Sequence, residues 1–198
     1  MGDHAGLGRP REFALDDAAR DAMQVFWDRG YEGASLPDLI EGTGLSRGSL
    51  YKAFGDKKGL LLAALDRYIA EGLTLTAQQL SQAGSARAAI RSSLLRHAAQ
   101  SSDGAGRRGC LVVAMATEQA AHDPEIAESA RGVFARLQQL YAAAIVRGQA
   151  SGEFPEREAQ AMARFLVCQI QGMRVLGKTG VAEAEMVATV ESTLRILG

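Results

Sequence analysis

Apolar and polar positions along this chain repeat with the spacing of an α-helix almost from end to end. Between Leu15 and Arg29 the apolar side chains return every three or four residues and form one stripe, and Gly30 follows as a stop signal. Only residues 111–113 look strand-like, and residues that favour helices flank them. The pattern therefore predicts an all-α fold.

The predicted helices fall into a group of short ones followed by a group of longer ones. After the first helix, they are expected at residues 36–43, 47–54, 56–82, 85–100, 110–122, 124–151, 155–177 and 182–197. Glycine, proline and small polar residues mark the breaks, and residues 101–109 form the longest predicted loop. No linker separates the two groups, so we place the domain boundary inside the long fourth helix. Residues 1–60 are expected to form a small N-terminal domain, and residues 61–198 a C-terminal helical bundle.

Two short helices meet at the tight turn Gly42-Thr43-Gly44-Leu45-Ser46, which has the length that a helix-turn-helix requires. Ser35 and Ser46 are suited to cap the two helices at their N-termini. The apolar residues that would pack these helices together and onto the first are Leu36, Leu39, Ile40, Leu45, Leu50 and Phe54. The second helix would then present polar side chains outward. This arrangement predicts a DNA-binding domain.

Composition and charge fit a protein that touches DNA with one local surface. Apolar residues make up 47% of the chain, the mean hydropathy is −0.06 and the formal net charge is −1. A net charge near zero argues against a chain that coats nucleic acid or membrane with its whole surface. Residues 46–58, however, carry four basic side chains and one acidic one, a local excess of +3. Such a patch is the electrostatic signature of a site-specific reader.

Other classes of protein are disfavoured by motifs that the sequence lacks. Cys110 and Cys168 are too far apart for a disulfide framework, and His4, His97 and His122 have no metal-ligand spacing. No P-loop, nucleophile elbow or catalytic carboxylate pair is recognisable, so we expect neither an enzyme nor a cofactor. The chain shows no signal peptide and no apolar run of about 18 residues. A cytoplasmic protein is therefore expected.

The segment LPDLIEGTGLSRGSLYKAFGDKKGLLLAALDRY resembles the DNA-binding signature of the TetR family of transcriptional regulators. The matching features are a small residue before Leu36, then Gly44, an apolar residue, Ser46 and a basic residue, followed by Gly-Ser-Leu-Tyr, Phe54 and Lys57. The resemblance covers about residues 11 to 70, and the rest of the chain agrees in helical character and size. One departure is Ile40, where the family usually carries a small alanine.

The resemblance implies a role in DNA binding for a defined set of residues. Tyr51 and Lys57 would hold phosphates, and Ser35 and Thr43 would make phosphate contacts beside the turn that Ser46 closes. The residues that would face base edges and phosphates in the major groove are Arg47, Gly48, Ser49 and Lys52. Arg9 and Arg11, placed before the first helix, would act as an arm that reaches the DNA backbone or minor groove.

The resemblance also implies a homodimer that binds a palindromic operator, usually represses transcription, and is released by a small-molecule effector. It assigns dimerisation to the last two helices. Their apolar stripes are Ala159, Met162, Ala163, Leu166, Ile170 and Met173 on one helix, and Val187, Val190, Leu194 and Leu197 on the other. An effector bound among the middle helices would shift the fourth helix and change the spacing of the two readers.

The effector site itself is left open by the sequence. Candidate ligand contacts are Cys110, Met115, Met162, Phe165 and Met173, although core packing is the first interpretation of the apolar ones. Cys110 follows Arg107 and Arg108 at a predicted helix start, so it is either a sensor of oxidants and electrophiles or a structural thiol. The sequence does not distinguish a repressor from an activator, and it does not give the number of dimers that bind one operator. A scaffold bundle without a DNA role and an enzyme of small hydrophobic substrates are the rival hypotheses.

Overall fold

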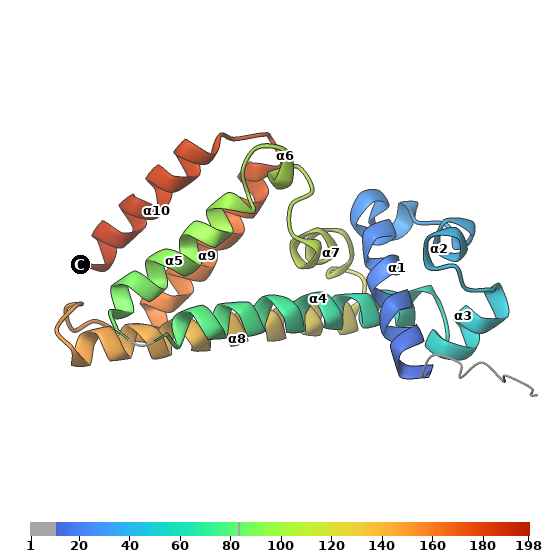
Figure 1. Ribbon diagram of the computed structural model, residues 1–198, viewed down its shortest axis with the longest axis horizontal. Coiled ribbons are helices and arrows are strands. Elements are labelled where there is room, and N and C mark those ends of the chain that lie inside the picture. The colour runs from blue at the N-terminus through green and yellow to red at the C-terminus, as the bar shows by residue number, and fades with distance from the viewer. Residues whose placement is uncertain (1–10, 83) are drawn as a thin grey trace, which may run out of the picture. The chain divides into compact units, whose positions relative to one another are not determined.

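The computed structural model describes residues 11–82 and 84–198, and these form helices and loops without a strand (Figure 1). The chain divides into two compact units, one that ends at Tyr68 and one that begins at Ile69. The helices are α1 (Arg11–Gly33), α2 (Leu36–Thr43), α3 (Arg47–Phe54), α4 (Lys57–Leu80), α5 (Ala86–Ala99), α6 (Asp103–Gly106), α7 (Leu111–Gln119), α8 (Pro124–Ala150), α9 (Ala159–Gly177) and α10 (Glu183–Leu197). The all-α prediction is confirmed.

The first unit packs α2 and α3 onto α1 and the start of α4. The apolar stripe of α1 is buried together with Leu39, Leu50 and Leu60, which α2, α3 and α4 contribute. Gly30 has a φ of 73° and interrupts the helical backbone of α1, as its place in the sequence predicts. The helix nevertheless begins at Arg11, earlier than the predicted Leu15.

The boundary between the units lies inside α4 but later than residue 60. Side-chain contacts hold the first turns of α4 against α1, because the ring of Tyr68 meets that of Trp27 edge-on at 5.1 Å and Arg67 donates a hydrogen bond to Asp16. The buried residues Leu61 and Leu65 belong to the same stretch. The apolar core of the first unit therefore extends past the point at which the sequence suggests a division.

In the second unit α8 and α9 lie side by side, and α5 packs against both of them and against α10 (Figure 1). The core is apolar over most of its extent, with Ile90, Ile145, Leu166 and Ile170 buried. None of the described helices is long and apolar enough to cross a membrane.

The connection between α8 and α9 is tied to the start of α5 through the carboxylate of Glu153. This side chain accepts hydrogen bonds from the backbone N–H groups of Ala86 (2.9 Å) and Arg87 (3.0 Å) and from the hydroxyl of Ser85. These bonds lower the pKa of Glu153 to about 2. A second carboxylate acts locally, since Glu158 caps α9.

Two predicted elements differ from the structure. The segment read as a loop, residues 101–109, contains the short helix α6, where Asp103 donates its N–H to the carbonyl of Val181. The helix predicted from Pro155 begins only at Ala159, because the amide of Gln149 donates to the carbonyl groups of Pro155 and Arg157. Hydrogen bonds outside the regular helices, which periodicity does not reveal, accompany both outcomes.

Most residues of the two apolar stripes predicted for dimerisation lie in the core of the second unit. Ala163, Leu166, Ile170 and Met173 of α9 are buried within the chain, as are Val190, Leu194 and Leu197 of α10. These buried side chains are used in the protomer's own core, so they do not mark a dimer face, and the assignment of dimerisation to the last two helices stays a prediction. Apolar residues have the same spacing in a helix that packs within its own chain and in a helix that packs against a second copy. Cys168 of α9 is exposed.

Candidate nucleic-acid interface

The turn between α2 and α3 is fixed by caps at both of its ends. Gly44 ends α2 with a φ of 66°, a left-handed conformation that glycine adopts without strain, and its N–H bonds to the carbonyl of Ile40. The hydroxyl of Ser46 then accepts the N–H of Ser49 at 3.2 Å and starts α3. The direction of α3 relative to α2 is thereby set by local hydrogen bonds.

Close packing of α2 on α1 supports this geometry. A Cβ atom at Gly42 would lie 2.5 Å from Cγ2 of Val25, so only glycine permits the observed approach of the two helices. Arg29 of α1 pairs with Asp38 of α2 at 3.2 Å. Asp38 also forms a capping box with Ser35, and the hydrogen bonds to Ser35 lower the pKa of its carboxyl.

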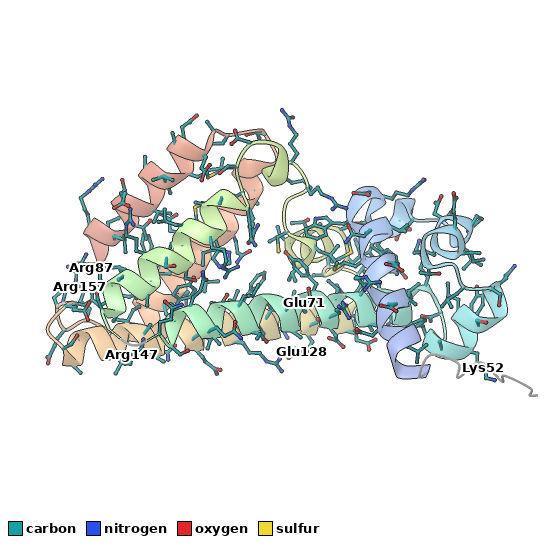
Figure 2. The ribbon with its side chains drawn as sticks, in the orientation of Figure 1. Lys52, Glu71, Arg87, Glu128, Arg147 and Arg157 are labelled. Atoms are coloured by element: carbon teal, nitrogen blue, oxygen red, sulfur yellow. The ribbon has the colours of Figure 1, made fainter. Side chains whose placement is uncertain are left out.

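Helix α3 buries one side chain and exposes the predicted contact residues. Leu50 is fully buried and anchors the helix. The exposed positions are Arg47, Gly48, Ser49, Tyr51 and Lys52. Lys52 projects outward from α3 (Figure 2). A helix that buries Leu50 and exposes polar side chains at 47, 49 and 52 is free to enter a DNA groove.

Gly48 has no structural reason to be glycine within the first unit. A Cβ atom there would meet nothing within 4 Å, and its φ is not positive. Glycine in a helix costs about 0.5–1 kcal/mol relative to alanine. A residue that weakens a helix without serving its packing is explained when an external surface comes close to the backbone.

Arg47 and Tyr51 lie one turn apart on the exposed face of α3. The guanidinium carbon of Arg47 is 5.6 Å from the centroid of the Tyr51 ring, within the range of a cation–π contact. Tyr51 is 41% exposed, which is high for a large aromatic side chain. The pair combines a cation with a phenolic hydroxyl, two groups that bind phosphate oxygens.

Lys57 is the first residue of α4, and its ammonium group lies 4.6 Å from the centroid of the Tyr31 ring. The same ammonium group donates to the carbonyl of Glu32 at 3.5 Å. The carboxylate of Asp56 caps the helix by accepting the N–H of Gly59 at 2.7 Å. Lys57 is thus held at a helix N-terminus, where the peptide dipoles add to its positive charge.

The remaining predicted contact residues have their hydroxyl groups engaged within the chain. Thr43 donates to the carbonyl of Leu39 (2.7 Å), and Ser35 donates to Asp38 (2.6 Å). Ser46 and Ser49 share a hydrogen bond of 2.9 Å. The hydroxyl hydrogens of Ser35, Thr43 and Ser46 are therefore used within the chain, whereas Ser49 accepts from Ser46. A contact with phosphate at these positions stays a prediction.

The predicted basic arm is only partly covered by the structure. Arg9 lies outside the described residues. Arg11 is the first residue of α1 rather than part of a preceding segment. Its role as an arm residue stays a prediction.

The predicted effector contacts differ in their burial. Met115 of α7 and Met173 of α9 are buried, whereas Met162 and Phe165 are half-buried. Cys110 is half-buried and precedes α7 without a side-chain cap hydrogen bond. The role of these residues in sensing stays a prediction. Among the described residues, no group of histidine, cysteine and carboxylate side chains is placed to hold a metal ion.

Sequence reasoning missed a polar cluster in the core of the second unit. Its members are Thr76, Ser93, Arg96, His97, Tyr141 and Arg174. The one signal in the sequence is an arginine at position 174, directly after Met173 on the apolar face of α9.

Comparison with known proteins gives matches along most of the chain. A family model described as bacterial regulatory proteins, tetR family, matches residues 20–64. A second model, the C-terminal domain of LmrA/YxaF-like transcriptional regulators, matches residues 86–190. The transcriptional repressor ComR of Escherichia coli is 31% identical over 96% of this chain and 91% of its own length. The repressor BdcR of the same organism is 26% identical over 92% of this chain and 88% of its own length.

Solved structures agree with these matches. A cysteine mutant of the TetR-family regulator CifR, complexed with a 26-base-pair operator, superposes with a TM-score of 0.84. It is 33% identical and the match covers 96% of this chain and all of that one. The reduced form of Escherichia coli NemR superposes with a TM-score of 0.79 at 19% identity, which supports the fold alone.

Proposed function

Because the chain belongs to the TetR family of bacterial regulatory proteins and is therefore a DNA-binding transcriptional regulator, we propose that it acts as a repressor. In this proposal it binds a palindromic operator as a homodimer and leaves the operator when an effector binds the second unit. Its family consists of regulators, so the chain is not an enzyme. The observation that carries the proposal is the exposed face of α3, on which Arg47, Tyr51 and Lys52 stand around a glycine that the fold does not require.

Repression is favoured over activation by the relatives that match along most of their length. ComR and BdcR are both described as repressors. The activator FasR of Mycolicibacterium smegmatis matches only 34% of this chain. A reporter gene placed behind the operator distinguishes the two, since loss of the protein raises expression under a repressor and lowers it under an activator.

A palindromic operator follows from the size of the reading surface. Helix α3 has eight residues, enough to contact the base edges of one half-site. Two copies related by a twofold axis read two half-sites about 34–36 Å apart for each helical turn between them. The CifR operator of 26 base pairs is longer than two turns of about 10.5 base pairs, which leaves room for two such half-sites.

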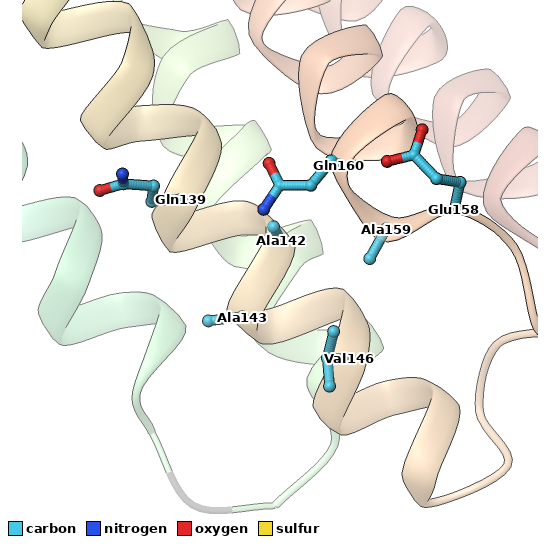
Figure 3. A pocket seen from close by; sticks show the side chains of 7 residues that line it. All are labelled: Gln139, Ala142, Ala143, Val146, Glu158, Ala159 and Gln160. Atoms are coloured by element: carbon cyan, nitrogen blue, oxygen red, sulfur yellow. The ribbon is translucent and has the colours of Figure 1, made fainter.

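We place the dimer contact on the exposed face shared by α8 and α9 rather than on the buried stripe of α9 and α10. A hollow of about 500 Å³ lies on this face (Figure 3). It is lined by Gln139, Ala142, Ala143, Val146, Glu158, Ala159 and Gln160. A second hollow of about 520 Å³ is lined by Arg131, Phe134, Ala135, Gln138, Arg164, Val167, Cys168 and Gln171.

The composition of this face suits a second pair of helices. Val146 and Val175 are 53% and 52% exposed, which is costly for aliphatic side chains unless a partner covers them. Alanines at 135 and 143 let two helices approach closely. A twofold pairing of α8 and α9 with their copies would form a four-helix contact in which the same residues meet from both sides.

The experiment that tests the dimer is a mass measurement by sedimentation on wild type and on Ala143→Glu. Ala143 is exposed in one protomer, so the substitution leaves the folded chain intact but buries unpaired carboxylates at the twofold contact. We expect a rise in the dimer dissociation constant of about a hundredfold. Ala184→Glu on α10, also an exposed alanine, is the matched control and keeps the wild-type constant. Equal effects of the two variants would place the contact elsewhere.

A further inference from the structure

The polar cluster in the second unit joins four helices within a core that is otherwise apolar. Thr76 of α4, Ser93 of α5 and Tyr141 of α8 are fully buried, and His97 and Arg174 are more than nine-tenths buried. The hydroxyl groups of Ser93 and Tyr141 share a hydrogen bond of 2.8 Å. Burial raises the pKa of Tyr141 to about 12. A set of convergent polar groups inside an apolar bundle is the usual composition of a small-molecule site.

His97 lies between two guanidinium groups. Its Nε2 is 3.3 Å from Nη2 of Arg96, and its Nδ1 is 3.3 Å from Nη2 of Arg174. Burial and the two neighbouring cations hold the pKa of His97 well below its usual range, so the ring is neutral. A neutral imidazole has one acceptor nitrogen, and it can therefore accept a hydrogen bond from only one of the two arginines. One of the two guanidinium groups therefore approaches a ring nitrogen that cannot accept its hydrogen bond.

Arg174 carries a buried charge whose hydrogen-bond partners are all neutral. It donates to the backbone carbonyl of Gln100 at 3.1 Å, to the side-chain oxygen of the same residue, and it approaches His97. In the part of the chain that the structure describes, no ion pair includes Arg174. The C-terminus of α5 offsets part of the charge through its carbonyl groups. A buried guanidinium normally has an anionic partner, because the cost of desolvating it is otherwise left uncompensated.

Arg96 places a second guanidinium on the other side of His97. It donates to Thr76 and to Gln79, each at 2.7 Å, and so points toward α4. Gln100 accepts from Arg96 as well as from Arg174. The two guanidinium groups therefore share Gln100 as an acceptor and lie at the two ring nitrogens of one imidazole.

We propose that the cluster of Arg96, His97 and Arg174 is the effector site of this regulator and that it takes an organic carboxylate. This assignment rests on the proposed function, because it names the ligand class to which the second unit responds. The planar fork of a guanidinium matches the two oxygens of a carboxylate, and the neutral ring offers an N–H. The apolar core around the cluster suits a ligand with a hydrocarbon or aromatic body.

The position of the cluster also supplies a route to the DNA-binding unit. Thr76 and Gln79 belong to α4, the helix that runs from Lys57 at the edge of the first unit. An anion that draws Arg96 away from these two residues removes two hydrogen bonds that hold the end of α4. Binding at the cluster is thus linked to the helix whose start carries a predicted phosphate contact.

The test measures the melting temperature of the full chain with hexanoate and benzoate, and with their neutral counterparts hexanamide and benzamide, each at about 10 mM. At least one carboxylate is expected to raise the melting temperature by about 3 °C or more, while its amide leaves it unchanged. The shape of acid and amide is nearly the same, so the difference reports the charge. No rise with either carboxylate, or equal rises with acid and amide, would overturn the proposal.

Variants then locate the charge. Arg174→Gln is expected to abolish the carboxylate-specific rise, and Arg195→Gln, an exposed arginine on α10, to leave it as in wild type. A rise that persists in Arg174→Gln overturns the assignment. Should that variant not fold, Arg174→Lys decides, since it keeps the charge but loses the fork. If the carboxylate-induced rise in melting temperature of Arg174→Lys is half that of wild type or less, the proposal is supported. A rise equal to that of wild type contradicts it.

Operator binding is measured separately on the same samples. Wild type that binds DNA but ignores carboxylates contradicts this inference and leaves the proposed function standing. Wild type that binds a carboxylate through Arg174 but no DNA contradicts the proposed function instead.

Discussion

The guanidinium of Arg47 lies over the ring of Tyr51, with 5.6 Å between its central carbon and the ring centroid. The contact holds two exposed side chains together on the face of α3, before any DNA is bound. Side chains that are already ordered lose less conformational entropy when they meet the phosphate backbone. The ring therefore positions Arg47, and the hydroxyl remains free to donate to a phosphate.

This division of roles predicts different effects for two substitutions at Tyr51. Tyr51→Phe keeps the ring under Arg47 but removes the hydroxyl, and operator affinity should fall about tenfold, as expected for one hydrogen bond to a charged group. Tyr51→Ala also removes the ring, and affinity should fall about a hundredfold. Fluorescence anisotropy with a labelled operator measures both. Equal losses in the two variants would show that the ring has no positioning role.

Lys57 should be distinguishable from Tyr51 by the dependence of binding on salt. The ammonium group of Lys57 would release a counterion from the DNA, whereas the neutral hydroxyl of Tyr51 would not. Lys57→Gln is therefore expected to reduce the slope of log affinity against log salt by about 1 per protomer, and Tyr51→Phe to leave it unchanged. Titrations between about 50 and 200 mM salt measure the slope. An unaltered slope in Lys57→Gln would remove Lys57 from the phosphate contacts.

Gly48 predicts opposite changes in stability and in DNA binding. Gly48→Ala should increase the free energy of unfolding by about 0.5–1 kcal/mol, because alanine favours the helix and its Cβ meets nothing in the chain. Operator affinity should fall at least tenfold, since the added methyl group keeps the backbone away from DNA. Urea unfolding and anisotropy measure the two quantities.

The matched control for this substitution is Gly72→Ala in α4. Its Cβ would also meet nothing within 4 Å, so the gain in stability should be similar. Operator affinity should stay at the wild-type value, because Gly72 lies outside α3. A loss of affinity that is equal in the two variants would attribute the effect of Gly48 to the loss of helix flexibility rather than to contact with DNA.

Glu153 predicts how stability depends on pH. Its pKa is about 2 in the folded chain against 4.5 for the ordinary side chain, because Ser85, Arg87 and Ala86 donate hydrogen bonds to the carboxylate. A folded pKa below the unfolded one means that this contribution is complete above about pH 4.5 and is lost as the pH falls toward 2. The free energy of unfolding should therefore decline less steeply below pH 4.5 in Glu153→Gln than in wild type. Urea unfolding at several pH values measures this, and Glu156→Gln in the same loop should follow the wild-type curve.

The sequence predicts the first unit well because its structure is determined locally. The ranges 36–43 and 47–54 are confirmed, since Ser35, Gly44 and Ser46 define the helix ends by capping and turn conformation. The exposure of Arg47 and Lys52 follows from helical periodicity once Leu50 is fixed as the buried position. Local signals of this kind are readable without a structure.

The second unit is harder to predict because tertiary contacts decide it. Helix α9 begins late since Gln149 holds the preceding residues in a loop, and periodicity carries no sign of that bond. Ala163 and Met173 have the spacing of either a core stripe or a dimer face, and only burial separates the two. Arg96, His97 and Arg174 come from positions that are far apart in the chain or look like ordinary helix residues. Their cluster appears only when α5 and α9 are packed together.

The role of α3 as an operator reader is tested most directly by selection of bound fragments from randomised double-stranded DNA by the purified protein, with Tyr51→Ala selected in parallel. We expect an enriched inverted repeat whose half-sites are separated by a whole number of helical turns, bound by two protomers, with no enrichment by the variant. Enrichment of a single unrepeated site would contradict the palindromic operator. Binding without sequence preference that fades with salt and is the same in Tyr51→Ala would contradict the role of α3 as the reader.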